Sequence, residues 1–369
     1  MRFLRAISTY RGDGMYCLIM AGGIGKRFWP RSRKNYPKQL LNIVSEDSML
    51  KLTYDRLLKI TSKEKIFIVA GENLKHVMLD SIIDFPEENY IVEPSGKNTA
   101  PCIALAAAII SKNDPNAVMG VFPADHLIEN FESFKESIKD GENVAKLHSG
   151  LVTFGITPTR PATGYGYIQY DRKLPLLENT AYKVKTFAEK PNPETAKRFL
   201  ETGEFLWNSG MFIWKAKDIL TSIKAHLSDL FDSVINIQAA YGTEKYGKIL
   251  REEWSTILGS SIDYGVMEKA NNVYVVKSDF VWSDVGSWDA VYELEKKDEN
   301  GNVLRGEVIN MNTKNCLISS NKRLISTIGL EDLIIVETKD AILVAKRGES
   351  EKIKDMVDTL KRTERNEYL

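Results

Sequence analysis

The chain has 369 residues and carries 50 basic and 50 acidic side chains, so its formal net charge at pH 7 is zero. This balance argues against a nucleic-acid-binding protein and gives the molecule no general attraction to an anionic membrane surface. Its three cysteines lie far apart and match no zinc-binding spacing, which is typical of the reducing cytoplasm. The longest apolar run, Cys102–Ile110, is too short to cross a bilayer, so we expect a cytoplasmic protein.

Residues 1–14 contain three arginines but no apolar core, so we expect a disordered extension there and no signal peptide. Met15 stands directly before the first predicted strand and is an alternative start of the protein. The sequence that follows alternates apolar runs with stretches of helical periodicity. This order predicts an α/β fold with a mixed, mostly parallel sheet and right-handed crossovers. The predicted strands are 16–20, 66–70, 90–92, 117–122 and 151–156, and the predicted helices are 48–60, 73–83, 100–112 and 131–148.

The second half of the chain has a different pattern. From about 164 to 214 it is rich in aromatic residues, which predicts antiparallel strands inserted over a second substrate. The polar stretch 298–301 predicts a break, and we place a domain boundary there, between 15–297 and 298–369. Beyond it the sequence predicts a small all-β unit with short strands at 306–310, 315–319, 323–327, 333–337 and 341–345 and a final helix at 350–361.

A glycine-rich, basic loop follows the first predicted strand. Its glycines allow backbone N–H groups to approach an anion closely, and its lysine and arginine side chains add positive charge. In a parallel sheet this loop lies at the carboxyl edge of the strands, where ligands bind. The loop therefore predicts a site for a nucleoside triphosphate. Its candidate contacts are Ala21, Gly22, Gly23, Gly25, Lys26, Arg27 and Lys38.

Two commoner glycine loops do not fit this segment. The dinucleotide fingerprint needs glycine where Phe28 stands, which disfavours an NAD-binding protein. The Walker loop fails at Met20, in the place of its first glycine, and at Arg27, in the place of its serine or threonine. A plain structural turn stays the alternative for the glycines taken alone.

The string RFWPRSRKNYPKQ at residues 27–39 resembles the opening motif of the sugar-nucleotide pyrophosphorylases, and is most similar to their mannose-1-phosphate guanylyltransferase branch. The resemblance covers residues 15–361. It implies a Rossmann-like nucleotidyltransferase domain, a small C-terminal β-helix-like domain used in association, and a homodimer. Relatives with a fused sugar-phosphate isomerase are longer, so we expect that second activity to be absent.

The resemblance implies transfer of GMP from GTP to α-D-mannose 1-phosphate, which gives GDP-mannose and pyrophosphate. The nucleophile is already an anionic oxygen, so the obstacle is repulsion between two polyanions, and cations are the useful catalysts. The implied catalytic groups are Arg27, Lys38, Asp125 and Asp284.

Asp125 follows the predicted strand 117–122, and Asp284 lies between two tryptophans. In the family these two positions hold Mg²⁺, with Mn²⁺ as an alternative. The alternatives without a metal are a helix cap for Asp125 and a turn for Asp284.

Further motifs of the family imply contacts with the base and the sugar. Glu93 is the candidate reader of the guanine edge. Asn98 and Thr99 either contact the nucleotide or cap the helix that begins there. The candidate contacts of the sugar phosphate are Gly164, Tyr165, Gly166, Glu189, Lys190, Asn208 and Asp263.

Two alternatives keep the same fold. A guanylyltransferase for another sugar 1-phosphate, such as a heptose or fucose, would differ by a few contacts that the sequence does not reveal. A non-catalytic homologue that binds GDP-mannose would be expected to have lost Arg27, Lys38 or one of the two aspartates. The sequence retains all of them.

Overall fold

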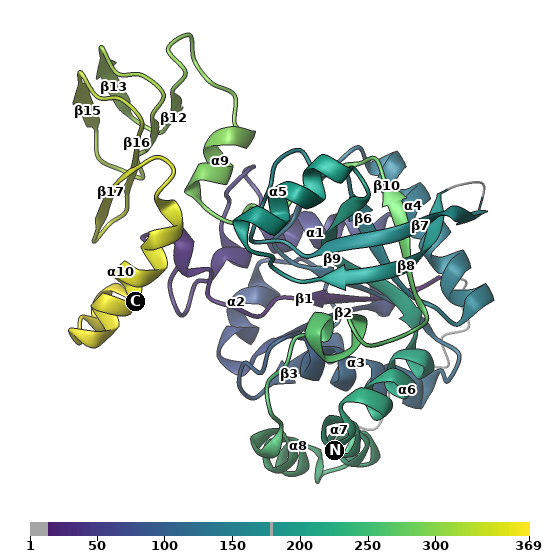
Figure 1. Cartoon of the computed structure of the whole chain (residues 1–369). Coiled ribbons are helices and arrows are strands. Elements are labelled where there is room, and N and C mark those ends of the chain that lie inside the picture. The colour runs from purple at the N-terminus through teal and green to yellow at the C-terminus, as the bar shows by residue number, and fades with distance from the viewer. Residues whose placement is uncertain (1–13, 178–179) are drawn as a thin grey trace.

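The computed structural model describes residues 14–177 and 180–369. The expected disordered extension lies outside these residues except for Gly14. The larger part of the structure is a nine-stranded sheet with helices on both faces, and a smaller β unit stands beside it (Figure 1). Helix α10 (Ile353–Arg362) follows the smaller β unit and packs against the larger part beside the glycine loop, which brings the two parts into contact (Figure 1).

The central sheet is mixed, as predicted. Its strands pair in parallel from β3 to β4 and between β6 and β10, and the other pairings are antiparallel. In spatial order the strands are β3 (Tyr90–Glu93), β2 (Ile66–Gly71), β1 (Tyr16–Met20), β4 (Val118–Pro123), β9 (Phe205–Lys215), β6 (Leu151–Ile156), β10 (Val273–Ser278), β8 (Ala181–Ala188) and β7 (Tyr167–Leu176).

Strand β1 shows why these apolar runs form central strands. Successive side chains point to opposite faces, so Leu18 joins one hydrophobic core while Cys17 and Ile19 join the other. All three are fully buried. A strand covered on both faces needs a continuous apolar run rather than an alternating one.

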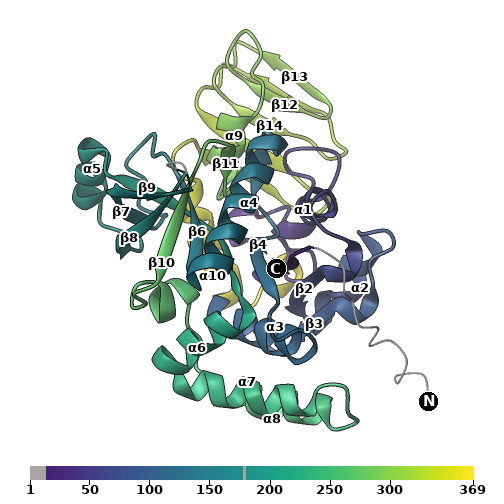
Figure 2. The same ribbon diagram turned by 90° about the vertical axis from the view of Figure 1, so that its right-hand side faces the viewer.

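Helices cover both faces of the sheet. The first core contains α3 (Thr99–Asn113), α6 (Ala216–His226), α7 (Ser228–Ala240) and α8 (Tyr246–Thr256), and Figure 2 shows the last three together on one side. The second core contains α1 (Met49–Leu58), α2 (Lys75–Asp80), α4 (Phe131–His148) and α5 (Pro193–Thr202). Within the described parts of the chain, no helix is both long and apolar enough to span a membrane.

The structure corrects the interpretation of residues 164–214 as an insertion. Strands β7 and β8 do form an antiparallel pair at the edge of the sheet. Strand β9, however, pairs with β4 and β6 in the middle of the sheet. It is buried along nearly its whole length, as a central strand must be.

The smaller β unit winds in successive turns. Strands β12 (Val303–Arg305), β14 (Leu317–Ser319) and β16 (Leu333–Glu337) stack in parallel, with Val303 beside Leu317 and Leu317 beside Ile334. On a second side β13 (Val308–Met311) lies parallel to β15 (Ile325–Ile328), and β17 (Ile342–Lys346) closes the first side antiparallel to β16. The expected β-helix-like arrangement is confirmed, while the boundary between 297 and 298 stays a prediction.

A third hydrophobic cluster joins the β unit to the segment after the glycine loop. It contains Phe28 and Trp29 of that segment and Ile353 and Val357 of α10. The helix α9 (Trp288–Leu294) contributes Trp288, whose ring contacts Phe28 with 5.2 Å between the ring centres. The C-terminal helix is therefore packed beside the loop.

Candidate active site

The glycine loop is shaped by a close approach between two residues of its motif. Gly25 has a φ of +68°, and a Cβ atom there would lie 2.4 Å from Cβ of Lys38. The backbone N–H of Lys38 donates to the carbonyl of Ile24 at 3.3 Å. Both the left-handed backbone and the missing side chain are needed, so glycine at this position is what allows Lys38 to enter the site.

Lys38 connects the two aspartates predicted to bind metal. It is only 5% exposed, and its Nζ donates to Oδ2 of Asp125 at 2.8 Å and to the backbone carbonyl of Asp284 at 2.6 Å. The aspartates converge because the short strands β5 (Leu127–Glu129) and β11 (Val281–Ser283) pair, which places Ser283 opposite Leu127. Residues far apart in sequence thereby share one corner of the fold.

Electrostatics at this corner favour an ionised carboxylate and a neutral imidazole. Burial, the largest single effect, would raise the pKa of Asp125, but Lys38, His126 and a backbone hydrogen bond together outweigh it and hold the pKa below its ordinary value. Burial lowers the pKa of His126 to about 4, so this side chain is neutral at pH 7. The Trp282 indole donates to Nδ1 of His126 at 3.2 Å, which fixes the ring.

A cavity of about 370 Å³ is lined by all four of the predicted catalytic residues. Its wall contains residues of the glycine loop, the two aspartates and one residue of the C-terminal helix. The residues that line it are Gly25, Lys26, Arg27, Phe28, Lys38, Asp125, His126, Asp284, Gly286 and Lys354. Cations and carboxylates that face one space suit a polyanionic ligand bound together with a metal ion.

The donor atoms at this cavity fit a divalent cation that arrives with phosphate. Within residues 14–177 and 180–369, no group of three or more His, Cys, Asp or Glu side chains is arranged to hold a metal by itself. Two carboxylates on one wall are instead the set that Mg²⁺ takes when phosphate oxygens and water supply its other ligands. Asp125 and Asp284 form such a pair.

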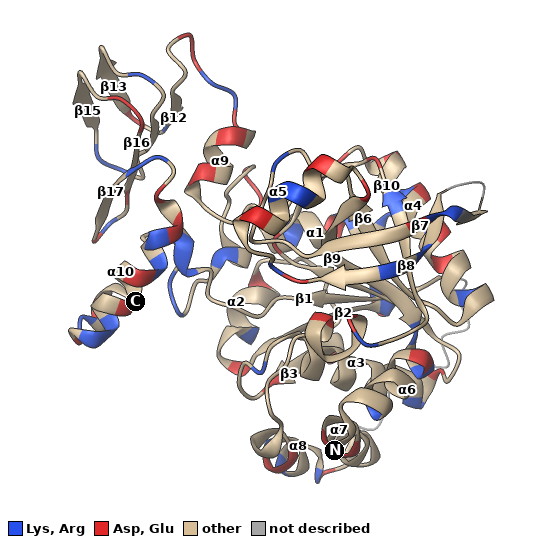
Figure 3. Ribbon diagram, viewed as in Figure 1, with Lys and Arg blue, Asp and Glu red and all other residues tan. Residues whose placement is uncertain are grey.

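The two other cations of the loop are turned toward the C-terminal segment. Nζ of Lys26 donates to Oδ1 of Asp358 at 2.6 Å. Nε of Arg27 lies 2.7 Å from Oε2 of Glu351, as an ion pair without a hydrogen bond. Figure 3 shows the basic positions of the loop beside the acidic positions of α10. Both cations are partly exposed, so these pairs are of the weak surface kind.

The residues predicted to contact the nucleotide base divide into two groups. Glu93 is buried, accepts from the backbone N–H of Lys97 at 3.0 Å, and has Oε2 3.5 Å from the Cβ position at Gly22. Burial raises the pKa of Glu93. Asn98, in contrast, caps α3 by accepting from the N–H of Thr99, whose hydroxyl accepts from Ile262. The capping alternative is therefore what the structure shows for Asn98.

The remaining backbone groups of the loop differ in whether the protein itself already uses them in hydrogen bonds. Ala21 is fully buried and its N–H donates to the carbonyl of Val69, so the sheet already uses it. The Gly22 carbonyl accepts from the side chain of Gln39 at 2.8 Å. Gly23 has a φ of +101°, a conformation that favours glycine. The loop is held by its own motif residues.

Four of the predicted sugar-phosphate contacts form one polar cluster. Nδ2 of Asn208 donates to Oδ1 of Asp263 at 2.9 Å, and Glu189 pairs with Lys190 at 2.8 Å. Burial, and then the charge of Glu189, raise the pKa of Asp263 to about 7. Asp263 begins a π-helical turn, Asp263–Met267. At Gly166 a Cβ atom would lie 2.4 Å from Oε2 of Glu189, whereas no atom lies within 4 Å of that position at Gly164.

Tyr165 links this cluster to the cavity. Its hydroxyl donates to Oδ1 of Asp284 at 2.8 Å, and its carbonyl accepts from the N–H of Lys190 at 3.2 Å. Its ring lies edge-on to Trp207 and Trp282. The side chain that the sequence assigned to the sugar phosphate thus orients a predicted metal ligand. Burial and the charge of Asp284 raise the pKa of this phenol.

Four residues of the cavity wall were not predicted from the sequence to belong to the site, namely Phe28, His126, Gly286 and Lys354, and two of them have titratable side chains. His126 directly follows Asp125, so its position beside a predicted ligand was a usable signal. Lys354 comes from the C-terminal helix, and nothing in its local sequence connects it with a loop more than three hundred positions earlier.

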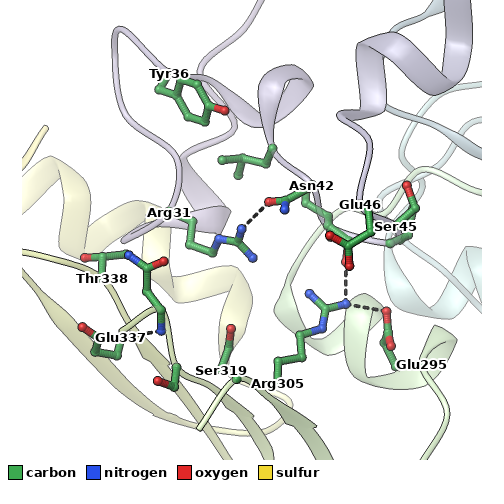
Figure 4. A pocket seen from close by; sticks show the side chains of 16 residues that line it. Arg31, Tyr36, Asn42, Ser45, Glu46, Glu295, Arg305, Ser319, Glu337 and Thr338 are labelled. Carbon is green, nitrogen blue, oxygen red and sulfur yellow. Dashed lines mark hydrogen bonds and ion pairs between the residues drawn. The ribbon is translucent and has the colours of Figure 1, made fainter. Parts of the chain in front are cut away.

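A second cavity, of about 680 Å³, lies between the β unit and residues 31–46 (Figure 4). Its charged groups are largely satisfied by the protein. Arg305 donates to Glu295 and to the carbonyl of Ile43, and Glu337 accepts from the backbone N–H groups of Asn321 and Lys322. It contains none of the predicted site residues, so the smaller cavity is the candidate active site.

Comparisons with known proteins agree with both parts of the fold. Residues 16–301 match the family model of nucleotidyl transferases. Residues 306–360 match the model of the MannoseP isomerase/GMP-like β-helix domain. The crystal structure of a mannose-1-phosphate geranyltransferase from Thermus thermophilus superposes with a TM-score of 0.85 at 28% identity, covering 94% of this chain and 99% of that one.

Curated relatives match over nearly the whole chain. It is 41% identical over 354 residues to a mannose-1-phosphate guanylyltransferase of Klebsiella pneumoniae, covering 95% of this chain and 75% of the relative. It is 36% identical over 364 residues to the alginate biosynthesis protein AlgA of Pseudomonas aeruginosa, covering 96% and 73%. The chain belongs to the nucleotidyl transferase family and, within it, to the mannose-1-phosphate guanylyltransferases.

Proposed function

We propose that this protein transfers the GMP group of GTP to α-D-mannose 1-phosphate, forming GDP-mannose and pyrophosphate. One observation carries the proposal beyond family membership. Tyr165 donates to Asp284 at the wall of the cavity that also contains Lys38, and its carbonyl accepts from Lys190 of the polar cluster. A polyanion site thereby adjoins a set of hydrogen-bonding groups suited to sugar hydroxyls.

The chain's own residues supply charge and position. Lys38, anchored between the two aspartates, places a positive charge where the transferred phosphoryl group gains negative charge. Lys190 offsets the charge of the incoming sugar phosphate, while Glu189 and Asn208 accept and donate hydrogen bonds to hydroxyls. Arg27 contacts the triphosphate after leaving Glu351, an exchange that costs little because the pair is exposed.

Asp125 and Asp284 would hold a divalent cation, Mg²⁺ or Mn²⁺, with triphosphate oxygens as further ligands. When bound, the cation would neutralise phosphate charge and polarise the phosphorus that is attacked. Tyr165 orients the second carboxylate and Lys38 the first.

Glu93 would read the guanine base. Its carboxylate lies beside Gly22 at the start of the loop. If the later residues of the loop bind the triphosphate, the base of the same nucleotide would lie near this start. The N1–H and N2–H₂ donors of guanine suit a carboxylate acceptor.

The cysteines and the exposed apolar side chains support proposals for the cell compartment and the oligomeric state of the enzyme. Cys17, Cys102 and Cys316 are all free and buried, which supports a place in the reducing cytoplasm. The exposed apolar side chains Ile309, Met311 and Ile328 on the β unit support association into a homodimer. Sedimentation equilibrium of the whole chain measures that state.

The test is pyrophosphate release from GTP with a divalent cation and a panel of sugar 1-phosphates. We expect turnover with mannose 1-phosphate to exceed that with fucose or heptose 1-phosphates and with glucose 1-phosphate. Preference for another sugar would change the assigned substrate. Tight binding of GDP-mannose without release from any sugar would show a non-catalytic homologue.

A further inference from the structure

The C-terminal helix α10 contributes to the wall of the active-site cavity. Ile353 and Val357 bury one side of it in the cluster with Phe28 and Trp29, which sets the rotation of the helix. Lys354 and Asp358 each come one residue later and therefore share the adjacent face. That face meets the glycine loop, since Asp358 binds Lys26 and Lys354 lines the cavity.

The charges around the cavity show which cation is available to a ligand. Lys26 is bound to Asp358, Arg27 to Glu351 and Lys38 to Asp125. The ammonium group of Lys354, in contrast, makes no hydrogen bond or ion pair within the part of the chain that the structure describes. An unpaired ammonium at the wall of a cavity can bind an anion without first giving up a protein partner.

The position of Lys354 also selects which phosphates it meets. Asp125 and Asp284 adjoin the paired strands β5 and β11, which bring them to one part of the cavity wall. Lys354 belongs to the part of the wall where the glycine loop meets the C-terminal segment, as the ion pairs of Lys26 and Arg27 show. In a triphosphate whose α-phosphate lies beside Lys38 and the two aspartates, this second part of the wall would receive the β- and γ-phosphates.

We infer that Lys354 is a substrate-binding cation of this site, which holds the β- and γ-phosphates of GTP and the pyrophosphate that leaves. The C-terminal unit, expected from the sequence to serve association, then also completes the nucleotide site. This inference rests on the proposed function, because it takes GTP as the ligand.

The experiment compares the wild type with Lys354→Ala, Lys354→Arg and the matched control Lys361→Ala, which removes an exposed lysine from the same helix outside the cavity. In the forward direction we expect Lys354→Ala to raise the KM for GTP by about tenfold, the effect of one charge-assisted contact, and to leave the KM for mannose 1-phosphate unchanged. In the reverse direction it should raise the KM for pyrophosphate to a similar extent. Lys354→Arg should restore most of the loss, and Lys361→Ala should behave as wild type.

The outcomes separate the two claims. A wild type that releases no pyrophosphate overturns the proposed function. An active wild type whose Lys354→Ala variant keeps the same KM for GTP and for pyrophosphate overturns the inference alone. A structural role for Lys354 would lower the melting temperature and raise both substrate KM values together, and that result also overturns the inference.

Discussion

Lys38 and Asp125 lie 87 positions apart in the sequence, and their charged groups meet at 2.8 Å. The same ammonium also binds the backbone at Asp284, so one side chain determines the geometry between both predicted metal ligands. We expect Lys38→Met to lower kcat/KM by up to three decades, since a unit charge at about 4 Å and an effective dielectric constant of about 20 is worth roughly 4 kcal/mol. Pyrophosphate release measures this.

The control for that variant is Lys34→Ala, which removes an exposed lysine from the same segment. We expect it to keep full activity. If Lys38→Met were as active as the wild type, Lys38 would have a purely structural role. The free energy of unfolding of Lys38→Met, measured in urea, should fall by about 1–3 kcal/mol because Asp125 loses its partner.

Asp125→Asn and Asp284→Asn test the metal site. Each substitution keeps size and hydrogen bonding but removes a negative charge, so the variants should need far more Mg²⁺ for half-maximal activity and lose about two to three decades in rate. Titration of pyrophosphate release with Mg²⁺ gives both quantities. Asp279→Asn, an exposed position just before β11, serves as the control. An unchanged Mg²⁺ midpoint would assign these carboxylates to folding instead.

Gly25→Ala tests the contact between loop and lysine. The new methyl group would collide with Lys38, and the φ of +68° would strain any L-residue. We expect a loss of about 1–3 kcal/mol in the free energy of unfolding and a large loss of activity. Gly247→Ala in α8 should instead be neutral or stabilising by up to about 1 kcal/mol, because alanine favours a helix. Equal stability of the two variants would contradict the geometry.

The pKa of Asp263 predicts a pH dependence of stability. An unfolded aspartate ionises near pH ~3.9, whereas burial and Glu189 raise the pKa of Asp263 to about 7 in the folded state. Between these values the folded protein binds the extra proton, so this group lowers the free energy of unfolding as pH rises from about 4 to 7.

Asp263→Asn should remove that contribution. The free energy of unfolding of the variant, relative to that of the wild type, should therefore increase as pH rises. Urea unfolding of both proteins at several pH values between about 5 and 8 measures this difference. Asp232→Asn, at an exposed position of α7, should show a constant difference. A flat profile for Asp263→Asn would mean that Lys190 compensates the buried charge.

The strands were predictable because their signal is local. The runs at β1 and β6 have the bounds that the sequence predicts, as does α4. The helices α6, α7 and α8 were not assigned, although Ile219 and Ile223 show the four-residue spacing of a buried helical face. The position of β9 in the sheet could not be predicted from the sequence, because the pairing partners of a strand depend on long-range contacts rather than on its composition.

The site residues likewise divide into those with a local sequence signal and those that depend on long-range contacts. The glycine loop and Asp125 could be assigned because each follows a predicted strand. The engagement of Tyr165 with Asp284, and the approach of Lys354, depend on contacts across 119 positions in the first case and on the docking of the last helix in the second. For Asn98 the sequence offered two roles, and the hydrogen bond that its side chain accepts from the N–H of Thr99 identifies the capping role.

The position of β9 has a consequence for the order in which the protein is made. A chain that has left the ribosome only as far as β6 contains β4 and β6, two of the three strands that pair with β9, but not β9 itself. The edges of β4 and β6 then expose unpaired N–H and C=O groups, which are templates for wrong pairing. The sheet becomes continuous only after residue 215 has emerged. Nascent chains stalled before residue 205 should therefore bind chaperones, and those released beyond residue 278, after β10 has filled the place between β6 and β8, should not.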